Sequence, residues 1–60
     1  MGPQRKWYIY ECQTMHYKYA TNVRAKSVSE ARQLGLREAR MVMGTHARIS
    51  SDRVFVNENP

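Results

Sequence analysis

The clearest hydrophobic pattern lies in residues 27–44, where apolar side chains recur at the spacing of one helix face. Ser27 followed three residues later by Glu30 is a capping box, which marks the start of a helix. Gly44 can adopt the left-handed conformation that ends one. We therefore expect a single helix here. Its predicted core face comprises Val28, Ala31, Leu34, Gly35, Ala39, Met41 and Val42.

The predicted core face contains one charged residue, Glu38, which needs a place at the rim or a cationic partner. The opposite side carries Ser29, Gln33, Arg37 and Arg40, with Arg32 at the margin and with Leu36 and Met43 beside them. One interpretation is a solvated face with two stray apolar residues. The other is an interface, because Arg and Met are enriched at interface cores.

The segments on either side of the helix have strand patterns. Residues 6–13 are apolar on both faces, which predicts a central strand. Residues 17–26 alternate after a turn at 14–16, and segments 45–50 and 53–57 are predicted as two further strands. In the alternating strand, Tyr17, Tyr19, Thr21, Val23 and Ala25 should face the helix, and Lys18, Arg24 and Lys26 should form a wet basic face.

These elements follow each other in the order ββαββ. They predict an α+β domain of two layers, in which an antiparallel sheet of about four strands carries one helix on one face. Sixty residues suffice for one small domain, residues 1–60, with a core over about 6–57. The start, Met1-Gly2-Pro3, is typical of an expression-tag remnant, so we expect residues 1–4 to lie outside the core.

Composition narrows the setting of the protein. Ten Lys and Arg against five Asp and Glu give a net charge of +5. This balance indicates a nucleic acid, an acidic protein or a ribonucleoprotein as partner. The cations are not gathered in one run, so a soluble domain with a basic bias is the alternative. A lone cysteine and the lack of a long apolar run favour a cytoplasmic protein without membrane contact.

Residue types that carry chemistry are few. The candidates Cys12, His16 and His46 match no zinc spacing. A cysteine–histidine nucleophile would need a pocket, for which so small a fold has little room. Cys12 is explained more simply as a small buried residue. We therefore expect no catalytic residue, no metal, no cofactor and no small-molecule substrate. A subunit of an enzyme, or an antitoxin-like partner, remains a third interpretation.

Tyrosines and cations alternate in the first two predicted strands. Tyr8, Tyr10, Tyr17 and Tyr19 lie among Lys6, Lys18 and Arg24. This pattern is compatible with a surface that stacks single-stranded nucleic acid. It is also compatible with rings that cover the helix. Because Tyr17 and Tyr19 share the parity of Val23, the second interpretation is favoured.

Short pieces spread over residues 8–56 resemble, in order and spacing, a family of small phage-encoded anti-CRISPR proteins that inhibit type I-F systems. The matching residues are Tyr8-Ile9, Glu11, Gln13, Val23, Ala25, Ser27, Ser29, Ala31, Arg32, Gly44-Thr45 and Arg48-Ile49. The resemblance implies a fold with one helix on an antiparallel sheet. It also implies a non-enzymatic inhibitor, encoded by a phage or mobile element and acting in the cytoplasm of a bacterial host.

The resemblance further implies a partner. Such inhibitors bind the backbone subunits of the type I RNA-guided surveillance complex near the guide RNA and hinder hybridisation of the target DNA. The family has also been linked to non-specific recruitment of duplex DNA. Its basic helix contacts correspond here to Arg32 and Arg37. This chain has Gln33 where the family has a cation, and Ala39 where the family has a polar contact.

We accordingly expect the partner-binding residues to be Arg32, Gln33, Leu36, Arg37 and Arg40. Lys18, Arg24 and Lys26 are the expected secondary basic surface. The alternative function is a small basic DNA-binding module of the excision or integrase arm-site type. In that case a sheet would enter the major groove while cations neutralise phosphates.

Overall fold

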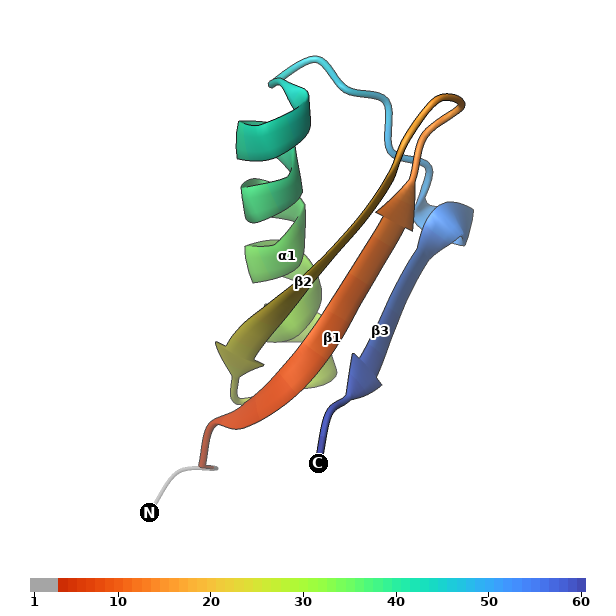
Figure 1. The fold of residues 1–60 in the computed structure, drawn as a ribbon. Coiled ribbons are helices and arrows are strands. Elements are labelled where there is room, and N and C mark those ends of the chain that lie inside the picture. Colours follow the sequence, from red (N-terminus) through yellow and green to blue (C-terminus); the bar gives the residue numbers. More distant parts are fainter. Residues whose placement is uncertain (1–3) are drawn as a thin grey trace.

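The computed structural model describes residues 4–60. The elements are strand β1 (Lys6–Gln13), strand β2 (Lys18–Ala25), helix α1 (Val28–Met43), the short 3₁₀ helix η1 (Ser51–Arg53) and strand β3 (Val54–Glu58). The strands form one antiparallel sheet in the order β2-β1-β3, and α1 packs against one face of it (Figure 1). The predicted α+β class is confirmed. The element order of residues 4–60 is ββαβ, with three strands.

The strand predicted over residues 45–50 is wrong. Ala47 N–H donates to the carbonyl of Gly44 at 3.2 Å, which turns the chain at the end of the helix. The following residues, 47–50, run without strand structure to η1. The central strand β1 already has β2 on one side and β3 on the other, so no position beside it is free for this segment. The alternating pattern is nevertheless real, because Ile49 packs against the core.

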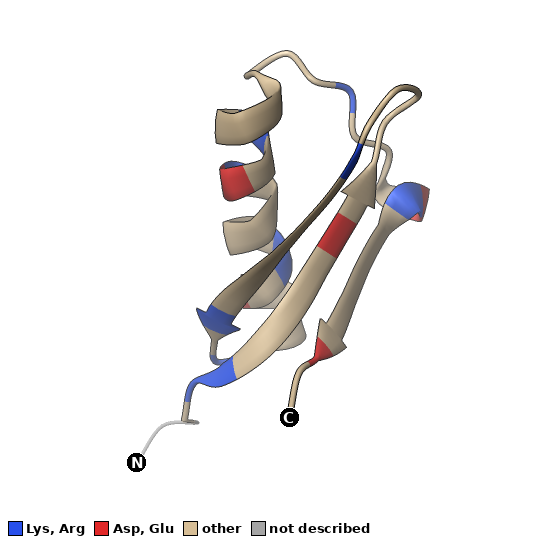
Figure 2. Ribbon diagram, in the orientation of Figure 1, with Lys and Arg blue, Asp and Glu red and all other residues tan. Residues whose placement is uncertain are grey.

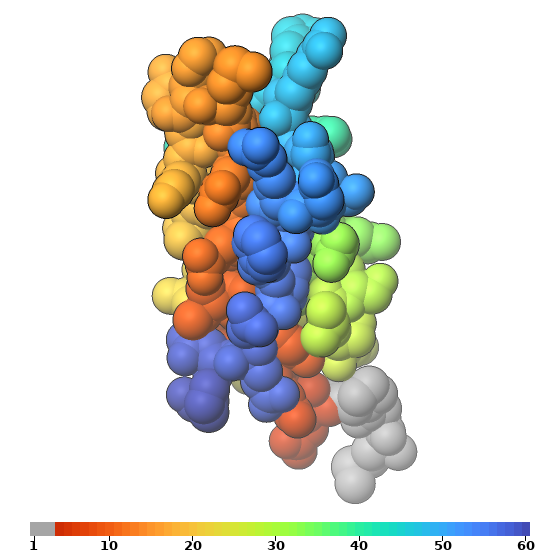
Figure 3. Space-filling view, turned by 90° about the vertical axis from the view of Figure 1, so that its right-hand side faces the viewer, coloured from red at the N-terminus to blue at the C-terminus, as the bar shows by residue number. Residues whose placement is uncertain are grey.

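The central position predicted for the first strand is confirmed. Tyr10 lies opposite Thr21 of β2 and opposite Val56 of β3. Tyr8, Tyr10 and Cys12 of β1 are all buried beneath the helix. Figure 3 views the molecule from the β3 side, where the β3 segment lies between β1 and part of α1.

The core consists of two clusters of buried residues. One contains Tyr8, Val23, Ala25 and Ala31, with Leu34 and Val56 packed against it. The other contains Tyr10, Cys12 and Ala39, covered by Tyr19, Leu36, Met43, Ile49, Val54 and Val56. The helix residues at the centre, Ala31, Gly35 and Ala39, are all small. Small side chains let the helix backbone lie close to the sheet.

Both ends of the helix are capped, with one difference from the predicted capping box: Glu30 reaches back to the Lys26 N–H instead of the Ser27 N–H. Ser27 Oγ accepts a hydrogen bond from Glu30 N–H at 3.1 Å, and Glu30 Oε1 accepts one from Lys26 N–H at 3.4 Å. At the other end, Gly44 has a φ of 105° and its N–H donates to the Arg40 carbonyl at 2.9 Å. These bonds satisfy backbone groups that a helix leaves unpaired at its ends.

The orientation of the helix about its axis differs from the prediction. Met41, expected in the core, is 78% exposed. Val28 and Val42 are also exposed, at 50% and 66%, but they lie on the face of the buried Ala31 and Ala39, so their exposure comes from their place in the first and last turns. Leu36 and Met43, expected off the core face, pack against it. The reason is tertiary: Ile49 and β3 cover the flank of the helix that carries Leu36, whereas Met41 faces a flank that nothing in residues 4–60 covers.

Glu38, the unplaced charge of the predicted core face, lies at the rim. Its Oε1 accepts a hydrogen bond from Thr21 Oγ1 of β2 at 3.3 Å. The carboxylate is therefore exposed and held by a hydroxyl instead of a cation. Helix α1, the only α-helix in the part of the chain that the structure describes, is too short and too polar to cross a membrane.

Candidate functional site

The outward side of α1 carries the predicted partner-binding arginines. We call the set Arg32, Gln33, Arg37 and Arg40 the helix face; all four are exposed. Gln33 and Arg37 are one turn apart, and so are Arg37 and Arg40, so they are neighbours on the helix surface. Figure 2 shows basic residues on this helix and at both ends of β2.

The charges of the helix face are not neutralised within the described chain. Among residues 4–60, the one ion pair within 4 Å joins Lys6 Nζ and Glu58 Oε1, at 3.5 Å. Arg37 and Arg40 repel each other at their i, i+3 spacing, at a cost of a few tenths of a kcal/mol. Arg40 lies in the last turn, and its attraction to the negative end of the helix dipole offsets part of this repulsion.

A shallow depression lies on this side of the helix. Its lining residues are Gln33, Leu36, Arg37, Arg40, Met41 and Thr45. The structure therefore brings together four of the five predicted partner-binding residues. Arg32 is exposed but does not line the depression.

Leu36 has a different role from the one predicted. It packs against the buried cluster that contains Tyr10 and Ala39, so its side chain belongs mainly to the core. What remains exposed of it contributes to the depression between the arginines. The physical cause is the orientation of the helix, which turns this flank toward β3 and Ile49.

The secondary basic surface is a line of separated charges. Lys18 and Arg24 lie near opposite ends of β2, and Lys26 follows the strand. At about 3.3 Å per residue, Lys18 and Arg24 are roughly 20 Å apart. All three are exposed. They do not converge on one point.

Sequence reasoning missed the aromatic residues of the open sheet face. Trp7 and Phe55 are 52% and 50% exposed on the side of the sheet away from the helix. The signal was available in part, because Trp7 has the opposite parity to the buried Tyr8 and Tyr10. Phe55 has the opposite parity to Val54 and Val56, which pack inward.

The tyrosines mostly cover the helix, as the favoured interpretation predicted. Tyr8 and Tyr10 are buried, and Tyr19 packs against the second core cluster. Tyr17 is the exception: it lies in the turn before β2, is 67% exposed, and its ring meets that of His16 edge-on with centroids 6.3 Å apart. A stacking surface built from all four tyrosines is therefore excluded.

Two buried polar groups lie in the second cluster. Burial raises the pKa of the Cys12 thiol, so the nucleophilic thiolate is disfavoured. Burial, and then the charge of the neighbouring Cys12, raises the pKa of Tyr10 to about 12. The Tyr10 hydroxyl has no hydrogen-bond partner among the described residues. Both groups are part of the packing and are closed to solvent.

The two histidines lie in exposed turns, outside the buried cluster that contains Cys12. His16 is in the turn between β1 and β2, and His46 is in the turn after α1; both are exposed. Within residues 4–60, no three side chains of His, Cys, Asp or Glu gather into a group that could hold a metal ion.

Comparisons with known proteins add no relative to this picture. No family model matches the chain, and the searches of curated proteins and of solved structures give no significant match.

Proposed function

We propose that this protein acts by binding a macromolecular partner through the helix face. One observation carries the proposal: three exposed guanidinium groups lie on one helix, and no carboxylate within residues 4–60 comes within 4 Å of them. Arginines of this kind are suited to carboxylates of a partner surface, because the planar guanidinium donates two parallel hydrogen bonds.

We propose further that the partner is a type I CRISPR surveillance complex, bound on its backbone subunits near the guide RNA. The support for this partner is the resemblance carried by the pieces between residues 8 and 56. Binding there would hinder hybridisation of target DNA. In this proposal the protein is encoded by a phage or mobile element and acts in the cytoplasm of the bacterial host.

The charge of the protein limits how such an inhibitor can work. RNA-guided complexes hold the guide–target duplex in a positively charged channel. A protein of net charge +5 cannot imitate DNA in that channel. It would instead dock on acidic protein surface beside the guide and obstruct the incoming strand.

One of the contacts implied by the resemblance cannot be made in this fold. The family has a polar contact at the position of Ala39, and Ala39 is fully buried against the sheet. The neighbouring exposed residues, Arg37 and Arg40, are therefore the principal contacts in this proposal.

The test is co-elution of the protein with purified type I surveillance complexes. A double charge reversal, Arg37→Glu with Arg40→Glu, should abolish co-elution and leave the circular dichroism spectrum unchanged. The matched control is Arg48→Glu with Arg53→Glu, which changes the net charge equally at exposed positions away from the helix. Loss of binding in both variants, or in neither, would refute the helix-face contact.

A second candidate function is direct binding of duplex DNA. The observation that favours it is the sheet face without a helix, which carries Lys18 and Arg24 together with the exposed amides of Asn22 and Asn57. Sheets of this kind can read the major groove. Binding of the protein alone to duplex DNA, with an affinity that falls steeply as salt rises, would favour this function over the first.

A further inference from the structure

Strand β2 is an open sheet edge. It pairs with β1 through all eight of its residues, in an unbroken register from Gln13↔Lys18 to Lys6↔Ala25. Within residues 4–60 nothing pairs with its other side. The strand contains no proline, no glycine and no bulge. Its outer backbone groups are therefore available to a further strand.

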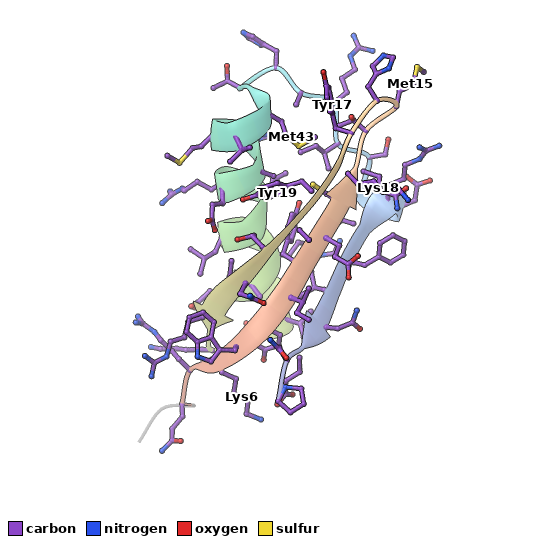
Figure 4. The ribbon with its side chains drawn as sticks, in the orientation of Figure 1. Lys6, Met15, Tyr17, Lys18, Tyr19 and Met43 are labelled. Atoms are coloured by element: carbon purple, nitrogen blue, oxygen red, sulfur yellow. The ribbon has the colours of Figure 1, made fainter. Side chains whose placement is uncertain are left out.

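The groove between this edge and α1 has apolar side chains at both of its ends, and the helix residues Arg37 and Glu38 also line it near the end of β2. Near the end of β2, a depression is lined by Val23, Leu34 and Met41, among others. Near its start, a second depression is lined by Tyr17, Tyr19 and Val42, with Lys18 and Met43. Figure 4 shows Tyr17, Tyr19 and Met43 at that end of the molecule. A strand added to β2 would place its helix-side residues over these apolar side chains.

The other side of the same edge is basic. Lys18 and Arg24 project from β2 on the open face of the sheet, and Lys26 follows two residues later. Residues directly opposite Lys18 and Arg24 in an added antiparallel strand would have their Cβ atoms about 5 Å from the Cβ atoms of these two residues. Acidic side chains at alternate positions of the incoming strand would meet them favourably.

The same charges disfavour a second copy of this chain. When β2 pairs with itself antiparallel and each side chain keeps its face, Lys18 lies opposite either Arg24 or Lys26 of the other copy in the two fullest registers. Like charges directly opposite each other destabilise a strand pair. Edge cations of this kind protect against self-association and leave an acidic strand as the compatible occupant.

We propose that the β2 edge binds an extended acidic segment of a partner protein by strand addition. The segment alternates acidic residues, which face Lys18 and Arg24, with apolar residues, which cover Met41 and Val42. Backbone hydrogen bonds to β2 supply affinity, and the alternating side chains supply specificity. The β2 edge adjoins the helix face, because Arg37 also lines the depression near the end of β2. The proposal does not rest on the proposed inhibitor function.

The probe is a ten-residue peptide that alternates glutamate and valine, with both ends blocked. We expect it to bind, with shifts in the amide resonances of β2 and of the last turns of α1. A peptide with lysine in place of glutamate should bind at least tenfold more weakly. Absence of binding by the glutamate peptide, or resonance shifts confined to Gln33 and Arg40, would overturn the proposal.

Two methylated peptides test the backbone pairing. In a strand, the N–H groups of alternate residues point to opposite edges. N-methylation of every valine and N-methylation of every glutamate therefore block opposite edges of the peptide. One of the two should lose binding and the other should keep it. Equal binding by both would exclude strand addition.

A protein variant tests the charge complementarity. The double substitution Lys18→Glu with Arg24→Glu should lower the affinity for the glutamate peptide at least tenfold. It should raise the affinity for the lysine peptide. Arg48→Glu with Arg53→Glu, which changes the net charge equally, should leave both affinities within about twofold. The proposal would also be overturned if the wild-type protein sedimented as a dimer and the amide resonances of β2 shifted with protein concentration. The occupant of the β2 edge would then be a second copy.

Discussion

Gly35 of α1 lies directly over the ring of Tyr10 in the central strand. A Cβ built on Gly35 would be 2.6 Å from Tyr10 Cβ and closer still to the ring. Non-bonded carbon atoms do not approach so closely without movement. The glycine is thus required by packing, because the helix backbone rests on the aromatic ring that fills the second core cluster.

Gly35→Ala should therefore destabilise the protein despite alanine's higher helix propensity. Overpacking of this kind costs about 1–3 kcal/mol, against a propensity gain of about 1 kcal/mol. We expect a lower midpoint in urea denaturation followed by circular dichroism. Ser29→Ala, on the exposed side of the same helix, should be neutral or stabilising. A Gly35→Ala protein as stable as the wild type would contradict the close packing.

Tyr10→Phe should not destabilise the protein at pH 7. The hydroxyl has no partner in residues 4–60, and an unsatisfied buried hydroxyl costs about 1–3 kcal/mol. The free energy of unfolding should stay equal or rise, as measured by urea denaturation. Tyr17→Phe, at an exposed position, should leave it unchanged. A clear loss of stability in Tyr10→Phe would show that the hydroxyl is hydrogen-bonded.

The raised pKa of Tyr10 also predicts a pH dependence. Below pH 10 both the folded and the unfolded chain keep the phenol proton. Between pH 10 and about 12 the unfolded chain loses it while folded Tyr10, with its pKa of about 12, retains it. Stability therefore falls as pH rises through this window, by up to roughly 3 kcal/mol from this group. Tyr10→Phe lacks this titration, so its unfolding free energy should exceed that of the wild type by a margin that widens as pH rises from 10 to about 12; a constant difference would refute the shift.

Ser27→Ala should destabilise the start of α1. The substitution removes the acceptor for Glu30 N–H, and loss of such a cap costs about 1 kcal/mol. Thermal unfolding is a suitable measurement, with a fall of about 4–8 °C per kcal/mol for a domain of this size. Ser50→Ala is the matched control, because Ser50 precedes η1 without a side-chain capping bond. Equal effects of the two substitutions would argue against the cap.

Leu36→Ala should destabilise the fold more than Met41→Ala. Leu36 packs against the second core cluster, and its truncation should cost about 2 kcal/mol. Met41 is 78% exposed, so its truncation should stay within about 0.5 kcal/mol. Chemical denaturation of both variants makes the comparison. A larger loss of stability in Met41→Ala than in Leu36→Ala would instead support the helix orientation predicted from the sequence, with Leu36 on the exposed side.

Local signals predicted the elements that depend on local structure. The capping box located the start of α1, and alternation identified β2 and its inward residues. The roll of the helix escaped prediction, because Met41 and Leu36 border the same broad apolar arc. Which border is buried depends on where Ile49 and β3 lie in space. The same limit applies to residues 45–50, where Ile49 packs on the core although the segment has no strand partner.

The candidate surfaces differ in the same way: one follows from local sequence pattern and the other depends on tertiary structure. Exposure of the helix-face arginines followed from the period of the helix, and the structure agrees. The open edge of β2 could not be predicted, because it depends on the sheet order β2-β1-β3. A pattern that predicts four strands leaves open which of them lie at the edges. The groove beside the edge likewise needs the position of the helix on the sheet.

The central position of β1 has a consequence for how the chain folds. Its pairing with β2 closes a turn of a few residues, whereas its pairing with β3 joins Cys12 to Val54, 42 positions along the chain. Closing the longer loop costs more conformational entropy, so the hairpin can form early and β3 docks late. Val56 of β3 packs against both core clusters. The strand that docks last thus completes the packing of both core clusters. Detachment of β3 would therefore expose both clusters at once.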